Sequence, residues 1–138
     1  MGLVLDTGVL LAAIEPRDRN HDACVDLLRA VREPRIVPAP VLVELEYLLR
    51  RVSDGAAFIT FLEDCRDGAF RIEPLLPEDY VRVGDLLEQY QDLGLGLVDA
   101  AVLAVTERLR EPKLATLDQR HFSVVRPRHV RALELLPA

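Results

Sequence analysis

Short apolar runs alternate along the chain with longer segments in which apolar residues recur every three or four positions. The first run, Leu3 to Leu5, contains no polar residue, which is typical of a strand buried on both faces. Asp6 and Thr7 end the run, and both residue types cap helix N-termini well. Residues 9–14 then follow at helical spacing. The sequence therefore predicts a buried strand that passes into a helix, with one carboxylate at the turn.

The same alternation predicts the rest of the secondary structure. Further strands are expected at residues 35–37, 70–72, 113–117 and 133–136, with 123–125 as the alternative for the last one. Further helices are expected at about 20–31, 40–52, 56–66, 77–90 and from 98 onward, and 119–122 is interpreted as a short turn. The helix from Val98 is apolar almost all round through Val105, which is typical of a buried helix.

Strands that alternate with helices indicate an α/β fold, in which helices cover both faces of a parallel sheet. We predict three α/β/α layers and a mainly parallel five-stranded sheet in the order 3-2-1-4-5. The first strand should be central, because its apolar run leaves no polar face. Ligands of open α/β sheets bind at the carboxyl ends of the strands, which is where Asp6 would lie.

Composition indicates an ordinary globular protein. A length of 138 residues suits a single domain over residues 1–138, and half of the residues are hydrophobic. No apolar run approaches the roughly 18 residues of a membrane span, and no secretory signal is visible at the N-terminus. The two cysteines, Cys24 and Cys65, lie in helical patterns. Reduced thiols, and hence a cytoplasmic protein, are expected.

The net charge of −6 argues against broad nucleic-acid binding through a basic surface. It does not argue against a nucleic-acid enzyme whose acidic site is neutralised by metal ions. The arginine clusters at residues 17–19, 29–35, 50–51 and 126–131 are interpreted as solvated faces.

Three aspartates stand where a site could form. Asp6 and Asp118 each follow a predicted buried strand, and their carboxylates would face each other if those strands are neighbours. Each could equally be a helix cap or a turn residue. Asp99 falls in the first turn of the apolar helix, where an acid needs either a capping role or a ligand.

A glutamate on the helix at 40–52 is a fourth candidate, although the pattern leaves its identity open. Glu44 and Glu46 border opposite sides of the apolar stripe, which comprises Val41, Leu45, Leu48 and Val52. Either could be a half-solvated surface acid. The histidines His21, His121 and His129 share no ligand spacing with the cysteines, so surface or packing roles are favoured over metal binding.

Four segments, in this order, resemble the PIN domain, and specifically the VapC-type toxins of bacterial toxin–antitoxin pairs. They are LVLDTGVLL (3–11), PVLVEL (40–45), LGLVDAA (95–101) and LATLDQRHF (114–122). Each is weak alone, but their combination over residues 3–122 is specific. Gly8 departs slightly from the pattern, since many members carry Ser or Asn there.

The resemblance implies which acids form the site. The four acids of the family fall on Asp6, Glu44, Asp99 and Asp118, which selects Glu44 over Glu46, while Asp92 is not placed by any motif. Thr7 and Thr116 fall where the family has hydroxyl residues near these acids.

The resemblance also implies an activity and partners. A ribonuclease is expected that cuts single-stranded or loop RNA and depends on Mg²⁺ or Mn²⁺. Asp6, Asp99 and Asp118 would bind the metal, and Glu44 would help to hold it or orient the attacking water. A homodimer and a cognate VapB-type antitoxin are expected as partners.

Two other classes of protein compete with this interpretation. A phospho-accepting receiver domain would need an acidic pair after the first strand and a lysine after the last, whereas Asp6 stands beside Thr7 and Lys113 precedes its strand. A catalytically inactive nucleic-acid-binding or scaffold PIN domain would not be expected to keep all four acids. A metal-dependent nuclease assay with a chelator control separates the three classes.

Overall fold

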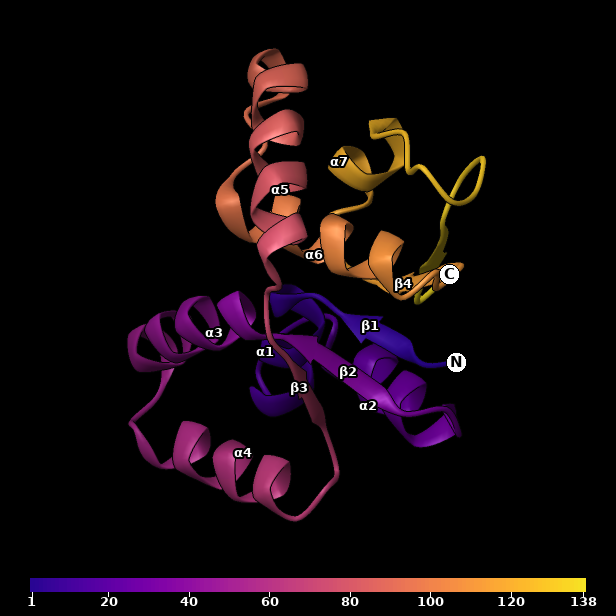
Figure 1. The fold of residues 1–138 in the computed structure, drawn as a ribbon. Coiled ribbons are helices and arrows are strands. Elements are labelled where there is room, and N and C mark those ends of the chain that lie inside the picture. The colour runs from indigo at the N-terminus through magenta and orange to yellow at the C-terminus, as the bar shows by residue number, and fades with distance from the viewer.

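Five parallel strands form one sheet in the order β3-β2-β1-β4-β5 in the computed structural model, which describes all 138 residues (Figure 1). The central strand β1 pairs with β2 and β4, so that Val4 lies opposite both Ile36 and Leu114. The predicted order, parallel direction and central first strand are confirmed. The strands are β1 Leu3–Leu5, β2 Arg35–Pro38, β3 Arg71–Glu73, β4 Lys113–Ala115 and β5 Glu134–Leu136.

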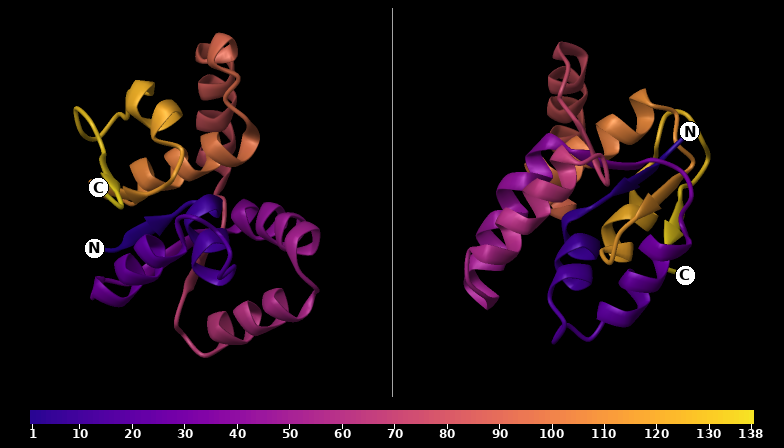
Figure 2. Two further views of the ribbon diagram at one scale, coloured as in Figure 1. Left: turned by 180° about the vertical axis from the view of Figure 1, so that it is seen from behind. Right: turned by 90° about the horizontal axis from the view of Figure 1, so that it is seen from below.

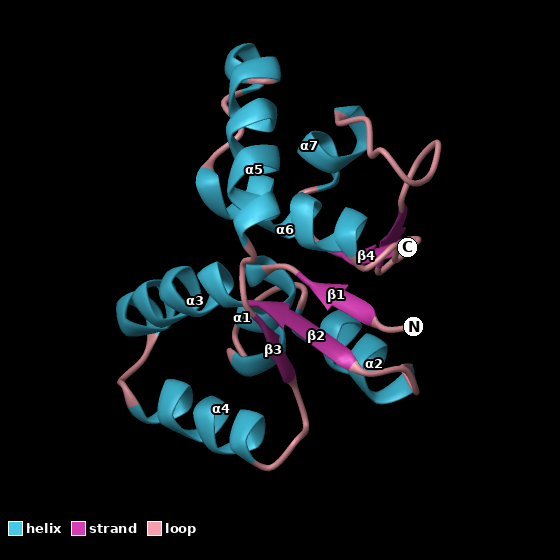
Figure 3. Cartoon of the chain, viewed as in Figure 1, coloured by secondary structure: helices cyan, strands magenta, loops and turns pink.

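Helices cover both faces of this sheet. Figures 1 and 2 show β1 running between α6 on one side and α1 and α2 on the other. Helix α5 packs on α6 and extends away from the sheet, and α3 contacts α1 and α6 (Figure 3). The helices are α1 Thr7–Ile14, α2 His21–Ala30, α3 Ala39–Val52, α4 Ala56–Arg66, α5 Pro77–Gln89, α6 Leu97–Arg108 and α7 Gln119–Val124, with a short 3₁₀ helix η1 at Gln91–Leu93.

Helix α6 is the buried helix that its apolar sequence predicts. Every residue from Ala100 to Glu107 is buried, and the helix contacts β1, β2, α3 and α5. The hydroxyl of Thr106, which would otherwise be unpaired in the core, donates to the Val102 carbonyl oxygen at 2.7 Å. Since α6 is fixed on all sides, the orientation of its first turn, which carries Asp99, is fixed as well.

Two local predictions are wrong. Residues 119–122 belong to a helix, because Asp118 caps it by accepting the His121 N–H. That helix rules out a strand at 123–125, and the last strand lies within 133–136, as preferred. On α3, Leu49 rather than Leu48 is fully buried with Val41 and Leu45, while Val52 is 42% exposed.

Neither cysteine forms a disulfide; Cys24 is buried in α2 and Cys65 is half-buried in α4. None of the helices combines the length and hydrophobicity that crossing a membrane requires.

Candidate active site

Asp6 is held at the junction of β1 and α1. Its Oδ1 accepts the backbone N–H of Thr7 at 2.8 Å, which caps α1. Its Oδ2 accepts the hydroxyl of Thr116 at 2.8 Å. The side chain can reach Thr116 because β1 and β4 are neighbours, with Leu5 opposite Ala115. Asp6 is therefore buried, 5% exposed, with both oxygen atoms hydrogen-bonded.

Thr116 links Asp6 to Asp118. Its Oγ1 donates to Asp6 and accepts the backbone N–H of Asp118 at 3.0 Å. The two acids that follow adjacent buried strands are thereby connected through one hydroxyl group. The other hydroxyl singled out in the sequence, Thr7 Oγ1, is buried without a hydrogen-bond partner, and only the backbone of Thr7 contacts Asp6.

The four acids selected by sequence line one cavity of about 560 Å³ at the carboxyl ends of β1 and β4. Asp99 reaches it from the first turn of α6, and Glu44 from the N-terminal half of α3. Gly8, Leu48 and Leu117 complete the lining. Asp6 and Asp118, which lie 112 positions apart in the sequence, thus line the same cavity.

A family model described as the PIN domain matches residues 3–126 of the chain. The chain belongs to the PIN-domain family. The matched segment contains all four cavity-lining acids, so the family assignment and the geometry describe the same part of the molecule.

Two known VapC proteins are similar to this chain over most of their length. Ribonuclease VapC26 of Mycobacterium tuberculosis is 28% identical over 125 residues, which are 91% of this chain and 93% of that protein. The structure of VapC20 from the same organism, described as a sarcin-ricin loop cleaving toxin, superposes with a TM-score of 0.80 at 18% identity. This match covers 86% of this chain and 91% of VapC20.

A second PIN-domain structure is VapBC2 of Rickettsia felis, solved bound to a DNA fragment from its promoter. It gives a TM-score of 0.71 at 18% identity and covers 98% of this chain and 97% of that one. At such identities the superpositions establish the fold, and the predicted three-layer PIN architecture is confirmed.

Burial and mutual repulsion raise the pKa values of two acids of this PIN domain. The pKa of Asp6 rises from 3.8 to about 6, chiefly because the side chain is buried and additionally because Asp99 and Glu44 are nearby. The hydrogen bonds from Thr116 and Thr7 counteract this rise. Burial also raises the pKa of Asp99, with a further contribution from the charge of Asp118. A cluster of this kind favours a bound cation.

The donor set fits a hard divalent cation. All four acidic side chains offer carboxylate oxygens, which Mg²⁺ and Mn²⁺ prefer over softer nitrogen and sulfur ligands. The cavity is also open enough to admit the water molecules that Mg²⁺ keeps when it binds to few protein ligands. Asp6, Asp99 and Asp118 are the residues that could hold such an ion.

Glu46 and Asp92, which the family motif does not select, lie outside the acidic cavity. Glu46 forms an ion pair with Arg50 one turn along α3 and does not line the acidic cavity. Asp92 is exposed in η1, outside the cavity.

His121 is the residue that sequence reasoning missed. We expected a surface or packing role, but its ring Nδ1 lies 2.6 Å from Asp118 Oδ2. One ligand atom from each of Asp99, Asp118 and His121 lies within 4.8 Å of the others. The signal was the three-residue spacing of Asp118 and His121, which becomes informative only when residues 119–124 are known to form a helix.

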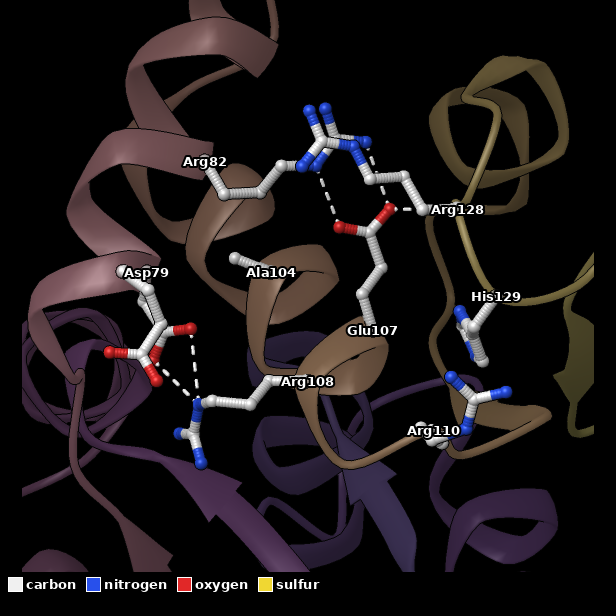
Figure 4. Close-up of a pocket in the computed structure, with 9 residues that line it drawn as sticks. Asp79, Arg82, Ala104, Glu107, Arg108, Arg110, Arg128 and His129 are labelled. Carbon is white, nitrogen blue, oxygen red and sulfur yellow. Dashed lines mark hydrogen bonds and ion pairs between the residues drawn. The ribbon is translucent and has the colours of Figure 1, made fainter.

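A second cavity, of about 310 Å³, lies between α5, the end of α6 and the segment after α7 (Figure 4). Arginine and acidic side chains form ion pairs with one another in this cavity. Arg82 makes two bonds to the Glu107 carboxylate, at 2.7 and 2.9 Å, and Arg108 lies 3.0 Å from Asp79. The backbone N–H of Arg128 donates to Glu107 at 2.8 Å. These contacts join three segments, and we interpret this network as structural.

Proposed function

We propose that this PIN domain, acting as one unit over residues 1–138, is a Mg²⁺- or Mn²⁺-dependent endoribonuclease toxin. The observation that carries the proposal is the convergence of Asp6, Glu44, Asp99 and Asp118 on one cavity. The similarity to ribonuclease VapC26 supports RNA as the substrate. Single-stranded or loop RNA is the expected target, because its backbone can enter an open cavity without a duplex being displaced.

The residues that line the cavity would have different roles in the reaction. Asp6, Asp99 and Asp118 would hold the metal, and Glu44 would assist them or orient the attacking water. A divalent cation bound there would supply activation of water and stabilisation of charge on the scissile phosphate. Thr116 would fix the relative positions of Asp6 and Asp118, as its two hydrogen bonds indicate.

The test is cleavage of RNA by the purified protein with Mg²⁺ or Mn²⁺, with a chelator as the control. Asp6→Asn, Asp99→Asn and Asp118→Asn should each lower the rate by about 100-fold or more, because each removes a charged ligand. Glu46→Gln, a change on the same helix as Glu44, should leave the rate near that of the parent. Equal loss in Glu46→Gln, or full activity in the three asparagine variants, would refute the assignment.

We also propose a cytoplasmic protein that forms a homodimer and is neutralised by a VapB-type antitoxin. Val43, Tyr47 and Leu97 are 75%, 51% and 57% exposed, and they line a hollow of about 480 Å³. Glu44 lines both this hollow and the acidic cavity. An antitoxin segment seated on the apolar residues could therefore place a basic side chain among the acids.

Substitution of the exposed apolar residues tests this partner. Val43→Asp should weaken co-purification with the co-expressed antitoxin, because it puts a charge into the hollow. Val81→Asp, at a 68% exposed position on α5, is the matched control and should leave co-purification unchanged. Light scattering of the protein alone measures the dimer; a monomer at high micromolar concentration contradicts that part of the proposal.

A further inference from the structure

His121 contacts Asp118 twice from the first turn of α7. Its backbone N–H donates to Asp118 Oδ1 at 3.2 Å, and its ring Nδ1 lies 2.6 Å from Oδ2. Both carboxylate oxygens of this acid are thus engaged by the same residue. The side chain of His121 is 20% exposed, compared with 37% for Asp118, so the contact is partly shielded from water.

The other ring nitrogen reaches a different part of the site. Nε2 of His121 lies 3.1 Å from the carbonyl oxygen of Leu93 at the end of η1. The chain then turns at Gly94, whose φ of 72° lies in the left-handed region, and enters α6, the helix that carries Asp99. The imidazole ring therefore bridges the turn after β4 and the loop before α6.

Hydrogen-bond chemistry defines what the ring does in this arrangement. The Leu93 carbonyl oxygen and the Asp118 carboxylate are both acceptors, so each ring nitrogen faces an oxygen atom of the protein. Ligand atoms of Asp99, Asp118 and His121 lie within 4.8 Å of one another, but both nitrogens of the ring are already in contact with these protein oxygens.

We propose that His121 is a positioning residue, which holds the Asp118 carboxylate beside Asp99 and ties it to the loop that leads into α6. The inference rests on the proposed function, because the metal site it would serve is the one proposed above. A carboxylate fixed in this way loses less rotational freedom when it binds an ion than a free one does. The metal site would then be largely organised before the ion arrives.

Replacing His121 with asparagine or with glutamine tests its two ring contacts one at a time. The amide nitrogen of asparagine occupies about the position of Nδ1 and can donate to Asp118, but it cannot reach Leu93. The amide nitrogen of glutamine occupies about the position of Nε2 and can donate to Leu93 without the Asp118 contact. His129→Asn is the matched control, because His129 contacts the Glu111 carbonyl oxygen outside the acidic cavity.

The experiment is calorimetric titration of each full-length variant with MnCl₂ alone, with thermal melting of each metal-free protein in a chelator. We expect His121→Ala and His121→Gln to bind Mn²⁺ about 10- to 100-fold more weakly than the parent, and His121→Asn within about threefold of it. His129→Asn should bind Mn²⁺ as the parent does. A merely structural role would lower the melting temperatures without separating the Mn²⁺ affinities of the asparagine and glutamine variants.

The outcomes are distinguishable. If the parent binds Mn²⁺ and His121→Ala binds it equally well, or His121→Asn is as weak as His121→Ala, the positioning role is overturned and the proposed function stands. If the parent itself binds no Mn²⁺, the proposed metal-dependent function fails, and the role of His121 fails with it.

Discussion

The raised pKa of Asp6 predicts that this acid destabilises the metal-free protein. A carboxyl group with a higher pKa in the folded chain than in the unfolded chain binds its proton more tightly when folded. Ionised Asp6 therefore lowers stability above the folded value, about 6, and this penalty is gone below the unfolded value of 3.8. The difference between these two pKa values lowers the free energy of unfolding by about 3 kcal/mol, because a change of one in pKa is worth about 1.4 kcal/mol.

Asp6→Asn removes the charge and keeps the shape. Asparagine can still accept the Thr7 N–H and cap α1, but its amide nitrogen cannot accept the Thr116 hydroxyl, a loss of about 1 kcal/mol. In a chelator at pH 8 the variant should be more stable by about 2 kcal/mol, or roughly 6 °C in melting temperature. Near pH 4, where most of the charge penalty is gone, this advantage should disappear and the variant should be less stable than the parent by up to about 1 kcal/mol, because the lost hydrogen bond then dominates.

Added metal should reverse the order at pH 8. An ion that binds only the folded parent stabilises it by about 2.7 kcal/mol at 100 times its dissociation constant. The assay is thermal melting between pH 4 and 8, with chelator or Mg²⁺, and Asp92→Asn as an exposed control outside the cavity. The reasoning is refuted if Asp6→Asn melts below the parent at pH 8 in chelator, or if the difference does not change with pH.

Three further substitutions test the supporting structure by thermal or urea unfolding. Thr116→Val should destabilise the metal-free protein by about 1–3 kcal/mol, because it removes the hydroxyl that bonds to both Asp6 and Asp118. Unchanged stability would show that these hydrogen bonds do not stabilise the fold. Arg108→Ala should cost about 3–5 kcal/mol by leaving the buried carboxylate of Asp79 without its cation, and Arg108→Lys should recover part of that loss. Leu103→Ala, at a fully buried position of α6, should cost about 2–5 kcal/mol through the cavity it opens, with RNA cleavage rates unchanged below the melting transition.

The sequence alone determined the sheet order and most of the elements. Hydrophobic periodicity reports which faces are buried, and a run such as Leu3 to Leu5, with no polar position, is typical of a strand covered on both sides. The same logic identified α6 as a buried helix, and all its residues from Ala100 to Glu107 are buried. Four motifs in a fixed order were enough to select Glu44 over Glu46 as a candidate, which periodicity could not do.

Only the tertiary structure decided how the acids meet and what holds them. Asp6 and Asp118 are 112 positions apart, and the bond between them through Thr116 exists because β1 pairs with β4. The contact of His121 with Asp118 depends on a six-residue helix, α7, whose capping the local pattern did not reveal. Periodicity reports which side of an element is buried; hydrogen bonds between side chains depend on angles and distances across elements, which only the folded chain fixes.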